Sequence, residues 1–363
     1  MKHHKCVFLL PEYNEKPIGG YKVVYEYANR LVRDGNDVTI VYPSFLFFWK
    51  SPLRRKLKML YFFVYYCFND KKGVGSWFSL DERVQHRKVW MLHESMIPQA
   101  DIYVATAIET AYYLNRWKTR ANSKKIYLVQ AFEDWDWGRD FVLKTWRYPM
   151  HKIVISEWLA GIARNLGESY TLIENGVDRE GLFSYIPYEE KKPMQVAMLY
   201  HKQPLKGCKD GLRALERVRE KYPELRSVWF GSAPKPKELP SWVSYYQQPS
   251  IEELNRIYNE SAVYLAPSHS EGFGLTVGEA MVCGCAVVCT NTGGFLTMAT
   301  DQWNALVVPV KDVERMSDAI IKLIEQPDVR FFIAQNGHRA IQRFTWDVAY
   351  NKFEKVLSNH SHK

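Results

Sequence analysis

Residues 267–281 read PSHSEGFGLTVGEAM, and this stretch decides the fold because a predicted strand precedes it and a predicted helix follows from within it. The apolar run at 262–266 predicts a buried strand, and the spacing of apolar residues over 275–282 predicts a helix. Between them, Gly272 and Gly274 permit a tight loop that a ligand can approach closely. The first N–H groups of such a helix lack partners and carry partial positive charge, so the step predicts a phosphate-binding loop.

Two acidic residues frame this loop. Glu271 lies at its mouth, and Glu279, eight positions on, lies in the helix, where a carboxylate can accept both hydroxyls of a ribose. The alternative is a simple glycine loop whose acidic residue favours the helix dipole. The length of the pattern and its strand–loop–helix context favour a ligand site.

The rest of the chain alternates β-rich runs with amphipathic stretches, which is typical of parallel α/β layers. Predicted strands lie at residues 6–10, 37–42, 102–105, 125–130, 153–156, 170–173, 195–200, 227–231, 262–266 and 286–290, and predicted helices include 210–221 and 346–357. We expect two Rossmann-like domains at 1–180 and 194–343, joined by a polar linker at 180–193. Residues 344–363 are expected to return to the first domain. Parallel sheets facing across a cleft would place a ligand between their carboxyl ends.

The composition suits a protein with two cores. The chain has 363 residues, 47% hydrophobic and 25% charged. The apolar run at 6–10 is too short for a signal peptide, and the longest one, 59–68, is about half of a spanning helix. The six cysteines form no disulfide framework, which indicates a reducing cytoplasm. The cluster at 283–289 lacks the second pair of a zinc site and has apolar neighbours, so we predict buried thiols and no metal site.

The net charge of +9 raises the question of an anionic partner. No nucleic-acid-binding motif accompanies it, which leaves nucleotide diphosphates and anionic membrane surfaces. Residues 45–63 interleave basic and aromatic side chains and can lie in the headgroup plane. A helix packed on its own domain with a solvated basic edge explains them equally well. The predicted location is the cytoplasm, with peripheral association at the inner membrane face under the first interpretation.

The segment 267–281 closely resembles the donor-site signature of the family-4 retaining glycosyltransferases of the GT-B fold, in which two glutamates separated by seven residues flank Gly-Phe-Gly-Leu. Further similarities follow in the family's order: ISEWL at 155–159, IENGVD at 173–178, GG at 293–294, NALV at 304–307 and FTW at 344–346. The resemblance covers nearly the whole chain except about residues 44–99. It implies transfer of a sugar from a nucleoside diphosphate to a hydroxyl acceptor, with retention of the anomeric configuration.

The resemblance also implies roles for individual residues. In the family, an Arg and a Lys after the first strand of the second domain hold the donor diphosphate. Lys206 matches the Lys, whereas His201 stands at the Arg position with Lys202 beside it, so which of these two contributes stays open. The alternative is a pair of solvated loop lysines. The remaining implied contacts are the amides of Gly272, Phe273, Gly274 and Leu275 with the diphosphate, Glu279 with the ribose, Glu271 with the donor sugar, and the turn at Gly19 and Gly20 with donor phosphates and acceptor.

The first half departs from the family pattern. Many relatives carry a catalytic-site His after the strand at 125–130, and here Gln130 and Glu133 stand nearest to its place. Glu133 is therefore our candidate for a catalytic group in this half. The acidic and aromatic residues of 132–137 can line an acceptor pocket, or form a solvent loop with tryptophans in the domain seam. This run is similar to bacterial rhamnosyltransferases of the family.

The implied enzyme works without a metal and without a resident cofactor, its co-substrate being the nucleoside diphosphate sugar. The implied acceptor is a glycan or a lipid-linked saccharide of surface polysaccharide synthesis, and nucleic acid is not an expected partner. The missing His motivates one alternative, a non-catalytic sugar-nucleotide-binding subunit that regulates or scaffolds a partner transferase. A further alternative is a GT-B sugar-nucleotide epimerase. A dehydrogenase is disfavoured because no Gly-x-Gly-x-x-Gly follows the first strand.

Overall fold

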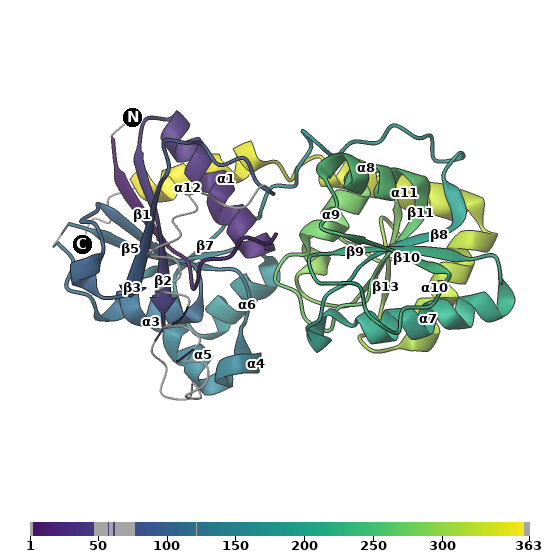
Figure 1. The fold of residues 1–363 in the computed structure, drawn as a ribbon, viewed down its shortest axis with the longest axis horizontal. Helices are drawn as coiled ribbons and strands as arrows, with labels where there is room; N and C mark the ends of the chain where they lie inside the picture. The colour runs from purple at the N-terminus through teal and green to yellow at the C-terminus, as the bar shows by residue number, and fades with distance from the viewer. Residues whose placement is uncertain (1–2, 47–56, 58–60, 62–76, 121, 359–363) are drawn as a thin grey trace. The chain divides into compact units, whose positions relative to one another are not determined.

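The computed structural model describes residues 3–46, 57, 61, 77–120 and 122–358, and these form two compact units (Figure 1). The first unit takes in 1–155, 159–173 and 350–363, and the second takes in 156–158 and 174–349. The segment 180–193, expected as a linker, therefore lies within the second unit. Most of the basic-aromatic segment 45–63 lies outside the described residues.

The first unit is built on a seven-stranded parallel sheet with strand order β3-β2-β1-β4-β5-β6-β7. Its strands are β1 (Lys5–Leu9), β2 (Asp37–Phe45), β3 (Gln85–Met91), β4 (Ile102–Ala105), β5 (Lys124–Val129), β6 (His151–Val154) and β7 (Tyr170–Leu172). Its helices are α1 (Gly19–Arg33), α3 (Ile108–Arg116), α4 (Asp134–Trp137), α5 (Arg139–Trp146), α6 (Glu157–Asn165, whose first two residues belong to the second unit) and the larger part of α12 (Trp346–Ser358). Figure 1 shows α1 and α12 over one face of this sheet and α3 over the other.

The C-terminal helix α12 is anchored in the first unit by Phe353, which is fully buried. Its ring stacks on Tyr27 of α1 at a centroid distance of 4.3 Å and lies 6.2 Å from the ring of Phe8 in β1. One turn earlier, the Tyr350 hydroxyl donates to the carboxylate of Asp34 at 2.6 Å. A large buried apolar side chain and a partly buried hydrogen bond thus attach α12 to the first unit.

The second unit is built on a six-stranded parallel sheet with strand order β10-β9-β8-β11-β12-β13. Its strands are β8 (Lys192–Leu199), β9 (Arg226–Gly231), β10 (Val243–Gln247), β11 (Ser261–Ala266), β12 (Ala286–Thr290) and β13 (Leu306–Val308). Its helices are α7 (Cys208–Lys221), α8 (Ile251–Glu260), α9 (Leu275–Val282), α10 (Val313–Glu325) and α11 (Pro327–Ile341). Figure 1 shows α8 and α9 on one face and α7 on the other, which covers both faces as a parallel sheet requires.

The segment expected as a linker is attached to α8 by two asparagine side chains. The Asn255 side chain accepts from the Phe183 N–H at 3.1 Å, and the Asn259 side chain accepts from the Tyr185 N–H at 2.9 Å. Asn259 is fully buried and also donates to the Phe183 carbonyl. These bonds satisfy backbone groups that lie outside any sheet, so a segment of irregular backbone is held in place.

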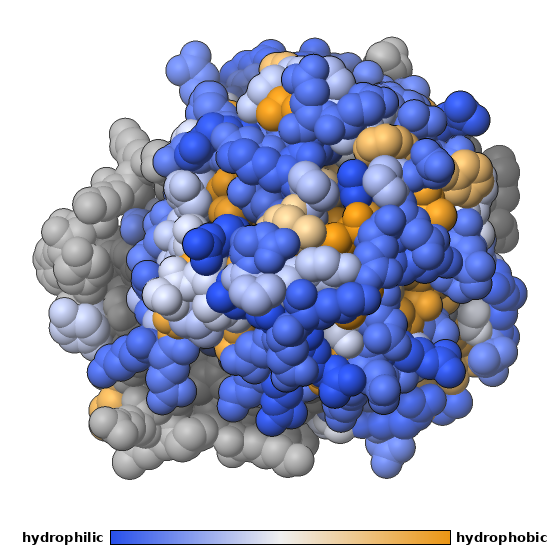
Figure 2. Space-filling view, turned by 90° about the vertical axis from the view of Figure 1, so that its right-hand side faces the viewer, coloured by the Kyte–Doolittle hydropathy of each residue, from blue (hydrophilic) through white to orange (hydrophobic). Residues whose placement is uncertain are grey.

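Other predictions about the surface and the cysteines can be compared directly. Cys283, Cys285 and Cys289 are buried thiols, as predicted, and burial raises the pKa of Cys289 to about 12. In the part of the chain that the structure describes, no group of three or more His, Cys, Asp or Glu side chains is placed to hold a metal ion. Across the same residues, no helix has the length and apolar character to cross a bilayer. Figure 2 shows one face on which hydrophilic residues predominate and hydrophobic residues appear in small patches.

Candidate active site

Two loops of the second unit meet at one edge of its sheet. Strands β8 and β11 are parallel neighbours, with Met198 opposite Leu265, so their carboxyl ends lie side by side. The loop at 200–207 leaves β8, and the loop at 267–274 leaves β11. This edge is where open parallel sheets bind ligands.

Lys206 and Glu271 join the two loops. The Lys206 ammonium donates to both carboxylate oxygens of Glu271, at 2.9 and 2.8 Å. The two side chains are 24% and 16% exposed, so the pair is shielded but reachable from solvent. Residues that are 65 positions apart in the sequence thus lie close enough to contact a single ligand.

Gly274 opens helix α9 next to this pair. It has φ of +91°, a left-handed conformation that favours glycine, and an added Cβ would lie 2.4 Å from the Phe295 ring. No side chain caps the helix here, and the Val277 N–H already donates to the Gly274 carbonyl at 2.9 Å, so the N–H groups that can meet an anion are those before Val277. Glycine is required for both the turn and the space.

Phe273 combines a predicted backbone contact with a buried side chain. Its side chain is 3% exposed and packs edge-to-face on Phe344, with ring centroids 6.0 Å apart. The ring therefore belongs to the core of the second unit. Only the backbone of Phe273 remains for the predicted contact with a diphosphate.

Glu279 lies inside α9 and is 7% exposed. The hydroxyl of Tyr258, from the end of α8, donates to one of its carboxylate oxygens at 3.2 Å. Tyr258 is fully buried, and burial raises the pKa of its hydroxyl well above the ordinary value, so it stays a donor. Sequence reasoning missed Tyr258, because only the fold brings residues 258 and 279 together.

His201 and Lys202 differ in their surroundings. The Nδ1 atom of His201 accepts from the Gln203 N–H at 3.1 Å, which places the proton of the neutral ring on Nε2. Burial, and then the charge of Lys206, lower the pKa of His201, while Glu271 opposes them. Lys202 is exposed. In the place of a family Arg, the chain thus offers a neutral N–H donor close to the Lys206–Glu271 pair.

In the first unit, Gln130 at the end of β5 contacts the first turn of α1. Its Nε2 atom donates to the Gly20 carbonyl at 3.2 Å, and an added Cβ on Gly20 would lie 3.3 Å from the same atom. Gly19 and Gly20 form the start of α1. The predicted glycine turn and the predicted replacement for the family's His are therefore neighbours.

Glu133 contacts the neighbouring helix. Its carboxylate accepts from the Ile108 N–H, the first of α3, at 3.0 Å. A carboxylate at a helix N-terminus is stabilising, which gives Glu133 a structural role. Trp137 donates through Nε1 to Glu109 of α3 at 3.2 Å, so this side chain also contacts α3.

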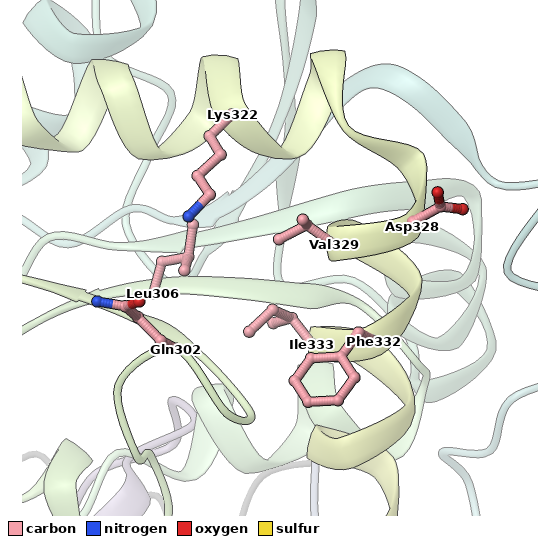
Figure 3. Close-up of a pocket in the computed structure, with 7 residues that line it drawn as sticks. All are labelled: Gln302, Leu306, Lys322, Asp328, Val329, Phe332 and Ile333. Atoms are coloured by element: carbon pink, nitrogen blue, oxygen red, sulfur yellow. The ribbon is translucent and has the colours of Figure 1, made fainter.

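A separate cavity of about 330 Å³ lies between β13, α10 and α11 (Figure 3). Its lining residues are Gln302, Leu306, Lys322, Asp328, Val329, Phe332 and Ile333. Its walls are mostly apolar, and none of the predicted site residues contributes to it. The chemistry-bearing residues lie instead on the two loops described above.

Comparison with known sequences gives a family match within the second unit and partial matches to several relatives. Residues 191–326 match the family described as Glycosyl transferases group 1. The D-inositol 3-phosphate glycosyltransferase of Saccharomonospora viridis is 35% identical over 95 residues, which are 26% of this chain and 22% of that protein. The protein of the same name from Kribbella flavida is 29% identical over 164 residues, 40% of this chain and 39% of that protein. The matches thus span well under half of these relatives, and they give the expected likeness to rhamnosyltransferases no support.

Comparison with solved structures covers nearly the whole chain. Anabaena Alr3699/HepE, solved in complex with UDP and glucose, gives a TM-score of 0.73 at 16% identity over 98% of this chain and 100% of that one. Sucrose-phosphate synthase from Thermosynechococcus elongatus gives 0.71 at 15% identity over 98% of both chains. At such identities the likeness establishes the fold. The predicted GT-B class, with two Rossmann-like domains on parallel sheets, is confirmed.

Proposed function

We propose that this chain is a glycosyltransferase that takes a sugar from a nucleoside diphosphate and transfers it to a hydroxyl group, with retention at the anomeric carbon. The observation that carries the proposal is the contact of Lys206 with both oxygens of Glu271 beside the uncapped start of α9. The family match at 191–326 spans this region, and the relatives are named as glycosyltransferases. Those names favour an enzyme over a non-catalytic subunit or an epimerase.

In the proposed binding mode the diphosphate lies across the two loops. Lys206 turns from Glu271 toward the phosphates, and His201 donates through Nε2. The N–H groups at the start of α9 complete the contacts to the leaving group. Glu279, held by Tyr258, accepts the ribose hydroxyls. These groups stabilise the negative charge that develops on the diphosphate, a role for which no metal or resident cofactor is invoked.

The proposed chemical step is a front-face displacement. The bond between the anomeric carbon and the β-phosphate oxygen breaks, and its electron pair stays on the phosphate. The acceptor oxygen bonds to the same face of the anomeric carbon, and its proton passes to the departing phosphate oxygen. Glu271 contacts the donor sugar and favours positive charge at the reacting carbon. The products are the nucleoside diphosphate and a glycoside with unchanged anomeric configuration.

We further propose a glycan or lipid-linked saccharide as acceptor, used at the cytoplasmic face of a membrane in surface polysaccharide synthesis. The basic and aromatic composition of residues 45–63 supports this proposal. Flotation of the purified chain with anionic liposomes tests it. Co-flotation that falls with rising salt is expected, and no flotation with vesicles rich in anionic lipid would count against the membrane role.

The proposed activity is tested by incubating the chain with a panel of nucleotide sugars and saccharide acceptors. Release of nucleoside diphosphate together with a new glycoside is expected, and proton NMR of that product gives its anomeric configuration. An inverted product would overturn the stereochemical part of the proposal. Conversion of the nucleotide sugar to an isomer without any acceptor would instead identify an epimerase.

A further inference from the structure

A second side-chain pair joins the two loops of the candidate site. The Nε2 atom of His269 lies 2.6 Å from a carboxylate oxygen of Asp210. His269 precedes Glu271 by two residues, and Asp210 follows Lys206 by four, in the first turn of α7. The side chains are 18% and 16% exposed, so water screens the pair only partly. Each partner is therefore within four residues of one member of the Lys206–Glu271 pair.

The backbones of the two loops are also in close contact around this pair. The His269 N–H donates to the Leu205 carbonyl at 2.7 Å. Gly207 has φ of +63°, and an added Cβ would lie 1.9 Å from the Pro267 carbonyl oxygen and 3.3 Å from the His269 ring. The two loops are in direct contact here, so a shift of the loop that carries His269 also displaces the loop that carries Lys206.

The charge of Asp210 needs a partner in this position. A partly buried carboxylate without a partner is costly, and its negative charge beside the loop that carries Lys206 would repel an anionic ligand. Arg213 approaches the other Asp210 oxygen only at 3.9 Å, and its side chain is 69% exposed, so this contact contributes little. The short, partly buried hydrogen bond from His269 is therefore the main contact that the Asp210 carboxylate makes.

We infer that the hydrogen bond between His269 and Asp210 positions Lys206 opposite Glu271. The two loops are then already in place when the donor diphosphate binds. His269 and Asp210 are positioning residues, since they act through Lys206. The inference rests on the proposed function, because it concerns the affinity of the chain for a nucleoside diphosphate. Preformed contacts of this kind raise affinity by removing the ordering cost from the binding step.

The test is a double-mutant cycle on nucleotide affinity. Isothermal titration of UDP, GDP, ADP and dTDP against the full chain first identifies the diphosphate that binds best. His269→Asn shortens the side chain so that it no longer reaches Asp210, and His269→Gln restores the reach with the same amide group. Both are measured with and without Lys206→Ala, and melting temperatures report the fold. His3→Asn is the control, because His3 forms an exposed 3.2 Å pair with Asp37 in the first unit.

We expect His269→Asn to weaken binding about tenfold and His269→Gln to stay within about threefold of the parent, since one charge-assisted hydrogen bond is at stake. In the Lys206→Ala background, His269→Asn should add less than about twofold. Two results would overturn the inference and leave the proposed function standing. One is an unchanged nucleotide affinity in His269→Asn, and the other is a loss of affinity from His269→Asn that is equally large in the Lys206→Ala background. Binding of none of the four nucleotides by the parent chain would overturn the proposed function, and this inference with it.

Discussion

The ammonium group of Lys206 lies 2.9 and 2.8 Å from the two carboxylate oxygens of Glu271, and this contact joins the loops that leave β8 and β11. In the proposed reaction the pair must separate, because a diphosphate competes with Glu271 for the same cation. Glu271 is then released toward the donor sugar. The ion pair therefore holds Lys206 near the site of the diphosphate and Glu271 near the site of the donor sugar before the donor binds.

Replacing Lys206 or Glu271 by Ala should lower turnover by about 10²- to 10³-fold, because each group acts on charge that develops in the transition state. Release of nucleoside diphosphate with a saturating acceptor measures the effect. Lys192→Ala is a matched control, since Lys192 forms a 2.8 Å pair with Glu260 in the same unit but away from the loops. Full activity in both site variants would refute the assignment.

Replacing Tyr258 by Phe should weaken donor binding about tenfold, because Glu279 loses the hydrogen bond that orients its carboxylate. The ring is retained, so packing is kept. Tyr264→Phe is the control, because Tyr264 is also buried and its ring centroid lies 5.6 Å from that of Tyr258. Equal losses of affinity in the two variants would show that Tyr258 acts on the core alone.

Donor affinity should rise as the pH falls from 8 to 6. Burial and Lys206 lower the pKa of His201, so the free enzyme carries a neutral ring at pH 7. A bound diphosphate adds negative charge and raises that pKa, so binding takes up a proton and is favoured at lower pH. Donor affinity is measured across this pH range in the parent and in His201→Gln. Protonation of the nucleotide itself affects both proteins equally, so the difference between the two profiles reports on His201. Identical pH profiles for the two would exclude His201 from the phosphate contacts.

Gly274→Ala should destabilise the second unit by about 2–5 kcal/mol, the sum of left-handed backbone strain and the clash with Phe295. Denaturant unfolding measures the loss. Gly35→Ala separates the two contributions, because Gly35 has φ of +83° with nothing within 4 Å of an added Cβ. Its loss should be about 1–2 kcal/mol, the strain alone. Equal losses at the two positions would show that the space beside Phe295 is not limiting.

Much of the fold could be predicted because its buried strands are continuous apolar runs. β4 and β12 have the predicted bounds, and most other predicted strands are displaced by one to three residues. β3 was missed because its sequence, QHRKVWM, carries polar and basic residues suited to an exposed sheet edge. β10, at the edge of the second sheet, was missed as well.

The candidate site could be predicted in part. Glu271 was found in the strand–loop–helix motif at 267–281, and Lys206 was implied by the family resemblance of the loop after the strand at 195–200. Tyr258, Asp210 and His269 were missed because their partners lie 21 or 59 positions away. The resemblance implied a contact for the Phe273 backbone amide, but it gave no sign that the Phe273 ring fills the core. Such side-chain pairings depend on tertiary packing, which local patterns do not contain.

The second unit is proposed to bind a nucleoside diphosphate through Lys206. Thermal shift with a panel of nucleotide sugars tests this most directly. At about 100 times its dissociation constant, the preferred donor should stabilise the parent chain by about 2.7 kcal/mol and raise its melting temperature by about 5 °C or more. The same concentration should leave Lys206→Ala nearly unshifted. A parent chain that no member of the panel stabilises, or an equal shift in Lys206→Ala, would contradict the account.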